Sequence, residues 1–379
     1  MKKAIFPFLL LLLSIFLFSC AQDPIFFNIS IEPEPKDPMI PGTPTNIVVH
    51  QGRLYTGTFQ GQRIFSFPTN GRWSEWSRPG GSLGELASDG TYLYALVFPT
   101  GNPLEASEIR YYSDGAWHRV NRGGGTGSYS IQTLYGAGGT IFAGGQIRHS
   151  NSVEYAILHV VNTGSSYELQ VLMTGTHLLR GAAERGGTVY LATAGDGIIN
   201  ASGLTRLSGT AGAVVTGIIH LGTDINPGAI AAVTTTGSGQ GSILISTDGT
   251  SFTSWRQDGF NFTGGMAIWR DPNNGFNPAL LLLGIRNRGF SLSHGYREMA
   301  LDSNGVPLPG LHTPGDYSPS SVADRPRYAA SLGNHPVHAI IQVPHEVVPH
   351  QSNVTPLIFA ATSVRGLWSY RDGQWNAED

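Results

Sequence analysis

The stretch that decides the fold is residues 230–252, IAAVTTTGSGQGSILISTDGTSF. It contains two short apolar runs, Ile230–Val233 and Ser242–Ile245, separated by a segment of threonine, serine and glycine. Runs of this length bounded by turn residues are typical of β-strands. The second run leads into Asp248-Gly249, which predicts a tight hairpin turn, and then into an aromatic residue, Phe252. A glycine, Gly228, precedes the first run, so one such unit predicts a strand, a glycine turn, a strand, a loop, a strand, an Asp-Gly turn and a further strand.

The first run recurs along the chain and marks a repeated unit. Its copies are Leu54–Gly57, Leu93–Leu96, Ile141–Gly144, Val189–Ala192, Ile230–Val233, Leu280–Leu283 and Ile358–Ala361. The first residues of successive copies are 39 to 50 residues apart, except for 78 before the last copy. A repeat of about 40–50 residues is typical of a four-stranded propeller blade.

A second strand follows each copy. These strands are predicted at Ile64–Phe67, Ile109–Tyr112, Ala156–His159, Gly197–Asn200, Ser242–Ile245, Gly289–Leu292 and Gly366–Ser369. Four of them lead into a turn and an aromatic residue, as in Asn70-Gly71 before Trp73, Asp114-Gly115 before Trp117 and Asp372-Gly373 before Trp375. We predict type I′ turns at these positions, with the aromatic side chain packed between neighbouring sheets.

A meander of this size buries little apolar surface alone, so the copies are expected to stack around an axis. We therefore predict an all-β fold, a single seven-bladed β-propeller of four-stranded antiparallel blades over residues 46–379. An insertion at about 300–336 precedes the last blade. Six or eight blades, a solenoid or a pair of β-sandwiches are the alternatives.

The turn between the third and fourth strands resembles the Asp-box of the sialidase-type repeat, Ser-x-Asp-x-Gly-x-x-Trp. Ser246-Thr247-Asp248-Gly249 with Phe252 is the best copy, and Ser113-Asp114-Gly115 with Trp117 is a looser one. The resemblance implies a structural role for these turns and no activity. Gln62-Arg63-Ile64-Phe65 does not match the Phe/Tyr-Arg-Ile-Pro start of sialidases, so the activity is not carried over.

Composition and charge exclude several classes of protein. Only 13% of the 379 residues are charged and 50 are glycine, which excludes a coiled coil or helical bundle. The net charge is -3. It argues against nucleic acid as a partner.

The N-terminus predicts export and lipidation. Lys2 and Lys3 precede an apolar run from Ala4 to Phe18, which ends in Leu17-Phe18-Ser19-Cys20. This resembles the bacterial lipobox, which implies a signal peptide over 1–19 and acyl chains on Cys20, the single cysteine of the chain. Residues 20–45 then form a proline-rich tether. An uncleaved N-terminal anchor is the alternative.

These features predict a lipoprotein of the bacterial cell envelope, held in the bilayer by the acyl chains of Cys20. Ala21 follows the cysteine, and by resemblance to lipoprotein sorting it favours the outer membrane. Exposure to the periplasm or to the cell surface stays open.

Binding residues are predicted on the face that carries the loops between the second and third strands and those between blades, because these loops are longer and more variable. The candidates are Gln60, Gln62, Arg148, Asp196, Arg286, Arg288 and Arg365. Guanidinium groups there suit an anionic or aromatic group of a partner. The alternative is that these arginines are simply solvated.

Neither a cofactor nor a metal is expected. His335, His338, His345 and His350 are close in sequence, but His338 and His345 flank a predicted inner strand and would lie apart, so they are weak metal candidates. Glu105, Glu108 and Asp196 are carboxylates on the predicted binding face with no evident pairing.

The chain contains no nucleophile elbow and no zinc-protease helix motif. We therefore expect a non-enzymatic binding or scaffolding propeller whose partner is another envelope protein. A surface adhesin or glycan-binding protein is the first alternative, and a glycoside hydrolase is the second.

Overall fold

The computed structural model describes residues 40–378 except 41, 70, 103–105, 176, 223–227, 238–239, 259, 271–278, 287–294, 309–335, 345–346, 348–357, 364–365 and 372–373. The chain divides into two units, Met1–Asp37 and Pro38–Asp379, and every described residue belongs to the second. Within the described ranges, no helix has the length and apolar character needed to cross a bilayer.

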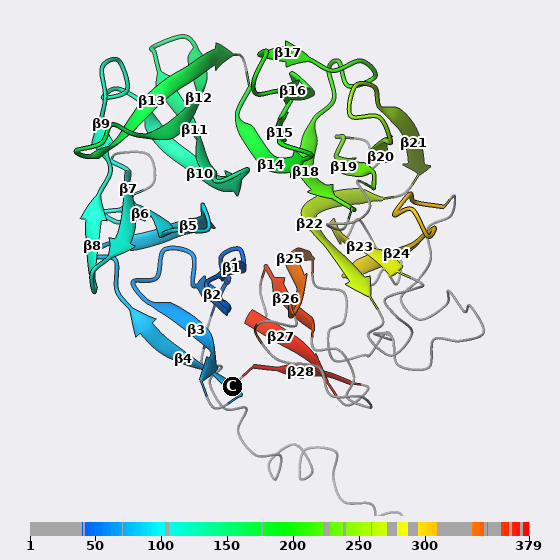
Figure 1. Ribbon diagram of the computed structural model, residues 1–379, viewed down its shortest axis with the longest axis horizontal. Coiled ribbons are helices and arrows are strands. Elements are labelled where there is room, and N and C mark those ends of the chain that lie inside the picture. Colours follow the sequence, from blue (N-terminus) through cyan, green and yellow to red (C-terminus); the bar gives the residue numbers. More distant parts are fainter. Residues whose placement is uncertain are drawn as a thin grey trace, which may run out of the picture. The chain divides into compact units, whose positions relative to one another are not determined.

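Seven antiparallel sheets follow one another around a central axis and form a seven-bladed propeller (Figure 1). Blade 1 contains β1 (Val48–His50), β2 (Arg53–Gly57), β3 (Ile64–Thr69) and β4 (Arg72–Ser77). Blade 2 contains β5 (Ser82–Ser88), β6 (Leu93–Phe98), β7 (Glu108–Ser113) and β8 (Ala116–Arg119). Blade 3 contains β10 (Ser130–Ala137), β11 (Thr140–Arg148), β12 (Val153–Asn162) and β13 (Tyr167–Gly175), with β9 (Asn121–Arg122) added in parallel to β13.

The remaining blades repeat this order. Blade 4 contains β14 (Leu179–Arg185), β15 (Thr188–Thr193), β16 (Ile198–Asn200) and β17 (Thr205–Arg206). Blade 5 contains β18 (Val215–His220), β19 (Ile230–Thr234), β20 (Gln240–Ser246) and β21 (Thr253–Asp258). Blade 6 contains β22 (Asn261–Arg270), β23 (Ala279–Arg286) and β24 (Tyr296–Leu301) in its described part. Blade 7 contains β25 (Val337–Gln342), β26 (Ile358–Thr362), β27 (Gly366–Arg371) and β28 (Gln374–Ala377).

The prediction of seven blades is confirmed, and each predicted first run is the second strand of a blade. One strand was predicted wrongly. The third strand of blade 6 is β24, whereas the predicted run Gly289–Leu292 lies outside the described residues. β24 pairs Met299 with Leu281 of β23, but its sequence includes Arg297 and Glu298, so an apolar pattern does not reveal it. It also takes up the start of the predicted insertion.

The turns before the fourth strands differ among themselves. Asp114 and Gly115 both have positive φ, as a type I′ turn requires. At the better Asp-box copy only Gly249 has positive φ, so the type I′ prediction is wrong there. The Asp248 carboxylate instead accepts hydrogen bonds from the backbone N–H groups of Thr250 and Ser251. Asn70 and Asp372-Gly373 lie outside the described residues.

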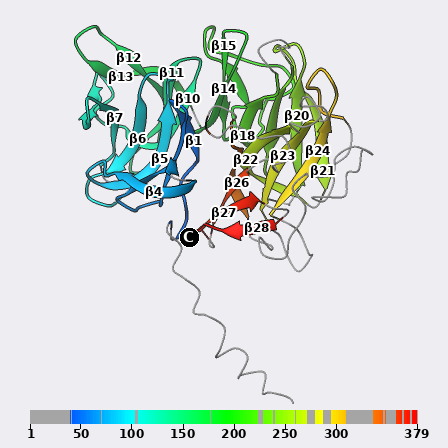
Figure 2. The ribbon, with the colours of Figure 1, turned by 60° about the horizontal axis from the view of Figure 1, so that its bottom comes forward.

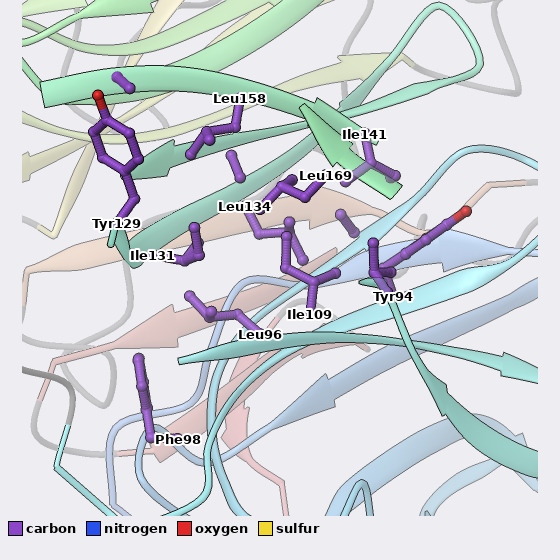
Figure 3. Close-up of a cluster of buried hydrophobic side chains, with 14 residues drawn as sticks. Tyr94, Leu96, Phe98, Ile109, Tyr129, Ile131, Leu134, Ile141, Leu158 and Leu169 are labelled. Atoms are coloured by element: carbon purple, nitrogen blue, oxygen red, sulfur yellow. The ribbon is translucent and has the colours of Figure 1, made fainter. Parts of the chain in front are cut away.

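Buried side chains of neighbouring blades meet in seven apolar clusters, one at each interface between blades of the described chain. Figure 3 shows the cluster between blades 2 and 3, where Leu96 and Ile109 meet Ile131 and Leu134. Burial of apolar surface stabilises the folded chain by about 25 cal/mol of free energy per Å². Because the apolar clusters lie between blades, each blade is stabilised mainly by its neighbours. This confirms the stacking of repeats that the sequence predicts.

The first strand of every blade lies nearest the axis, as the labels β1, β5, β10, β14, β18 and β25 show (Figures 1 and 2). Six of these strands have a register shift against the second strand of their blade. In blade 1, three residues lie between the Pro44–Thr58 bridge and the Val48–Tyr55 pair, whereas the partner strand has two. A β-bulge therefore recurs near the start of all seven inner strands.

Candidate functional site

A cavity of about 700 Å³ occupies the axis of the ring, and all seven blades contribute to its wall. The contributions of blades 1 to 7 in order include Asn46, Glu85, Tyr135, Arg180, Thr216, Gly264 and His338. Ala194, Thr235 and Arg286, at or just after the ends of second strands, line it as well. The cavity therefore lies toward the face of the 2→3 loops, where the sequence predicts binding. We call it the axial cavity.

The β-bulges place four of these side chains in the axial cavity. In an unbroken strand successive side chains alternate between the two faces of the sheet. A bulge adds a residue and redirects its side chain. Arg180, Thr216 and His338 are each the unpaired residue at the register shift of their strand. Glu85 lies between the shifted pairs of Leu83 and Leu86.

The wall formed by blades 2 to 4 is charged, and we call Glu85, Tyr135 and Arg180 the polar wall. Glu85 is partly exposed toward the cavity that it lines, and its Oε2 accepts a hydrogen bond from the backbone N–H of Leu134, 2.6 Å away. Burial raises the pKa of Glu85 to about 7, although that hydrogen bond and the Arg180 guanidinium favour the charged form. Burial and the Glu85 charge also hold the pKa of Tyr135 well above 10.0. The polar wall thus combines a carboxyl group that titrates near neutrality with a cation.

Blades 5 and 6 form a wall of a different kind, and we call Thr216, Thr263, Gly264 and Gly265 the close-packed wall. The Thr216 hydroxyl donates to the carbonyl oxygen of Phe262, and the Thr263 hydroxyl donates to that of Val337. A Cβ atom added to Gly217 would lie 2.4 Å from the carbonyl oxygen of Gly264. Glycine at this contact lets two inner strands approach closely.

His338 joins the last blade to the first. Its Nε2 lies 2.7 Å from the carbonyl oxygen of Pro44, so Nε2 carries the proton and donates. Burial lowers the pKa of His338, while the bond to Pro44 opposes this effect. The other nitrogen, Nδ1, is buried and has no hydrogen-bond partner among the described residues. A neutral imidazole in a structural contact is the simplest account of this geometry.

The other predicted metal candidates, His335, His345 and His350, lie outside the described residues. In the part of the chain that the structure describes, no three histidine, cysteine, aspartate or glutamate side chains converge on a metal position.

The predicted binding residues fall into three groups. Arg286 lines the axial cavity, whereas Arg148 lines a separate pocket between blades 2 and 3. Gln60, Gln62 and Asp196 are on the predicted face but do not line either space. Three predicted residues lie outside the described residues, namely Cys20, Arg288 and Arg365.

The carboxylates of the loop face are held in ion pairs. Asp196 lies 3.3 Å from Nδ1 of His177 and 3.8 Å from the Arg206 guanidinium. Glu108 pairs with Arg110 at 2.8 Å and with Arg119 at 3.4 Å. Glu105 lies outside the described residues. Glu85 is therefore the carboxylate that the described structure places in the axial cavity.

Glu85, Tyr135 and Arg180 are not among the residues predicted from the sequence, because functional side chains were expected in loops and these three lie on inner strands. A signal was nevertheless present, since a polar residue followed by a small one stands near the start of three inner strands. The copies are Arg180-Gly181, Thr216-Gly217 and His338-Ala339. In a buried strand such a pair indicates a bulge that turns the polar side chain out of the sheet.

Comparison with known proteins identifies the fold and leaves the family open. No family model and no curated protein matches the chain. Among solved structures, a catalytically inactive variant of virginiamycin B lyase from Staphylococcus aureus with quinupristin is similar, with a TM-score of 0.52 and 13% identity over 89% of this chain and 96% of that one. A streptogramin B lyase has a TM-score of 0.52 and 12% identity over 87% and 94%. A selenomethionine-substituted virginiamycin B lyase from Staphylococcus aureus has a TM-score of 0.51 and 12% identity over 86% and 94%.

These comparisons contradict the expectation that the propeller is not an enzyme. The similar solved structures are lyases, and the likeness covers nearly their whole length. At 12–13% identity the likeness shows a shared fold and carries no substrate over to this chain. The expectation was wrong because it relied on missing local motifs, whereas a propeller assembles side chains from separate blades around its axis.

Proposed function

We propose that this protein is an envelope lipoprotein whose axial cavity is the active site of an acid–base enzyme that cleaves a small organic anion. The observation that carries the proposal is the convergence of inner-strand side chains on one cavity, where a carboxyl group whose pKa burial raises and a guanidinium line the same wall. A cavity of about 700 Å³ has a volume within the usual range for small-molecule sites.

Glu85 is the proposed general acid and base. A catalytic group transfers protons best when its pKa lies near the working pH, and the pKa of Glu85 is raised to about 7. Perturbed carboxyl groups in a cleft are characteristic of functional sites. The hydrogen bond from the Leu134 N–H fixes one carboxylate oxygen and leaves the other for substrate.

The arginines supply the positive charge. In an elimination, the Glu85 carboxylate takes a proton from a carbon next to a carbonyl group. The electron pair of the broken C–H bond forms the new C=C bond as the leaving group departs. Arg180 stabilises the negative charge that develops on the carbonyl oxygen, and the protonated Glu85 then protonates the leaving group. Arg286, exposed at the end of β23, would attract the anionic substrate.

The anchor is a separate part of the proposal, supported by the sequence. The lipobox-like Leu17-Phe18-Ser19-Cys20 would place acyl chains on Cys20 and tether the propeller to the envelope, with the outer membrane favoured. Another envelope protein remains a proposed partner. Radiolabelled palmitate should label the protein in cells and should fail to label Cys20→Ser, and equal labelling of both would contradict the anchor.

Turnover of candidate substrates tests the enzyme. Small esters, lactones and 3-hydroxy carboxylates would be screened by proton NMR with the full-length chain and with Glu85→Gln. We expect turnover that depends on a group with a pKa near 7 and falls at least 100-fold in Glu85→Gln. Glu184→Gln is the matched control, because Glu184 is also on an inner strand but does not line the axial cavity. Undiminished turnover in Glu85→Gln would contradict the assignment.

A further inference from the structure

A second pocket lies away from the axis, between blades 2 and 3. Its volume is about 520 Å³, and its wall comes from β7, β8, β9, the following connection, and the ends of β10 and β11. It lies toward the same face as the 2→3 loops, where Arg148 ends β11. We call it the side pocket.

The chain forms the side pocket through an unusual connection. After β8 it does not pass directly to the inner strand of blade 3. It first adds β9 to the outer edge of blade 3, with Asn121 and Arg122 parallel to Glu168 and Leu169 of β13. Residues 123–129 then lead back to β10, and the last three of them line the pocket.

Arg122 holds this connection in place. Its guanidinium donates hydrogen bonds to the carbonyl oxygens of Thr126, Tyr129 and Ser107, at 2.8, 2.6 and 2.6 Å. The Tyr129 ring lies at the edge of the apolar cluster shared by the two blades (Figure 3). Its hydroxyl donates to the Glu154 carboxylate. The floor of the pocket is therefore formed in advance of any ligand, which reduces the entropic cost of binding.

The charge of the side pocket is not balanced. Its lining includes Arg119, Arg122 and Arg148 but one carboxylate, Glu108. Glu108 already pairs with Arg119 and with Arg110. Arg122 is hydrogen-bonded to neutral carbonyls; burial and then repulsion from Arg119 lower its pKa, while the Glu108 charge opposes this effect. A partly buried guanidinium whose neighbouring carboxylate already pairs with two other arginines would be stabilised by a bound anion.

Arg148 provides the recognition group on the opposite wall. It is exposed at the end of β11 and forms no ion pair with any described residue. A guanidinium presents a planar fork that matches a carboxylate with two parallel hydrogen bonds. Gln146 lies on the same strand as Arg148, and Ser128 lies on the connection before β10. Their side chains are neutral groups of the kind that bind hydroxyls.

We propose that the side pocket is a binding site for a small hydroxylated carboxylate of the size and chemistry of a sugar acid. The carboxylate would pair with Arg148 in the field of Arg119 and Arg122, and the hydroxyls would bind Gln146 and Ser128. A single carboxylate offsets one of the two excess positive charges without placing a dianion beside Glu108. This site is independent of the axial cavity, so it stands or falls separately from the proposed enzyme.

The test uses the full-length chain in detergent and isothermal titration with D-glucuronate, D-glucose and inorganic phosphate. We expect D-glucuronate to bind at least tenfold more tightly than D-glucose or phosphate. Arg148→Ala should weaken D-glucuronate binding at least tenfold, and Arg148→Lys should restore part of it, since it keeps the charge without the fork.

The matched control is Arg72→Ala, because Arg72 is also exposed at the end of a strand but lies on the opposite face of the ring. It should bind D-glucuronate as the parent chain does. Equal binding of D-glucuronate and D-glucose would overturn the proposal, as would unchanged binding in Arg148→Ala. Tighter binding of phosphate than of D-glucuronate would overturn the assignment to a sugar acid.

Discussion

The polar wall and the close-packed wall are built on the same local feature and perform different tasks. In both, a β-bulge near the start of an inner strand turns a side chain toward the axis. In blades 2 and 4 that position holds Glu85 and Arg180, whose charges face the cavity. In blades 5 and 6 it holds Thr216 and Thr263, whose hydroxyls bind the main chain of the next blade. The bulge recurs around the ring, and the residue at it decides whether that part of the wall presents a charge to the cavity or a hydrogen bond to the next blade.

Adding one carbon atom to the close-packed wall tests whether the close approach of its strands stabilises the fold. Gly264 has a φ of +99°, and its Cβ would lie 2.1 Å from the carbonyl oxygen of Thr216. Gly264→Ala combines backbone strain with a clash against main chain, so we expect a loss of about 3 kcal/mol or more in the free energy of unfolding. Urea denaturation measures it.

Gly90→Ala separates the two causes. Gly90 also has a positive φ, +88°, but its Cβ would meet no atom within 4 Å. We expect a loss of about 1 kcal/mol there, from backbone strain alone. If the two variants lost equal stability, close approach of the strands would not be what Gly264 provides.

The polar wall should make the free energy of unfolding depend on pH. The pKa of Glu85 in the folded chain, about 7, is above its ordinary value of 4.5. Its contribution to stability is therefore complete below pH 4.5 and is lost as the pH rises through 7. Glu85→Gln removes this loss, so the variant should exceed the parent chain by up to about 3 kcal/mol at pH 8 and should differ much less at pH 4.

Denaturation of the parent chain, Glu85→Gln and Glu184→Gln between pH 4 and 8 checks this prediction. Glu184→Gln should follow the parent chain, because Glu184 lies on an inner strand outside the cavity. A parent chain whose stability did not fall between pH 5 and 8 relative to Glu85→Gln would show that the carboxyl is solvated like any other.

Asp248, a carboxylate outside the axial cavity, should have the smallest effect on stability, and its pH dependence should have the opposite sign to that of Glu85. The backbone N–H groups of Ser251 and Thr250 and the Thr250 hydroxyl hold the pKa of Asp248 below its ordinary value of 3.8. Its stabilisation is present above that value and is lost as the pH falls. Asp248→Asn should be slightly less stable near pH 7 and should lose less stability on acidification, as measured by denaturation between pH 2 and 5. A steeper acid loss in Asp248→Asn would contradict the role of this turn.

The fold was largely predictable because its signal is local and repeated. The second strands, such as Leu93–Leu96 and Leu280–Leu283, are continuous apolar runs that are buried on both faces. The strand β24 escaped prediction because it buries Arg297 and Glu298, which interrupt that pattern. The number of blades can be predicted by counting such runs. The bounds of a blade that contains a charged strand cannot be predicted in this way.

The candidate site was predictable only in part, for a physical reason. Arg148 and Arg286 end second strands, so a prediction that looks at loop ends finds them. Glu85 and Arg180 are 95 residues apart in the sequence and line the same cavity because blades 2 and 4 face one axis. A bulge that redirects a side chain is a register shift between two strands, and one strand read alone does not show it.

The closure of the ring has a consequence for how this chain is organised. Blades 1 and 7 are each made of one continuous segment, so neither end of the ring borrows a strand from the other. The junction is held instead by side chains, through His338 with Pro44 and through the packing of Phe359 against Phe67 and Trp73. Each blade is thus formed by one continuous segment of the chain. The architecture depends on the order of these segments around the ring and not on the point at which the chain begins. We therefore expect circularly permuted chains that start at another blade to form the same ring.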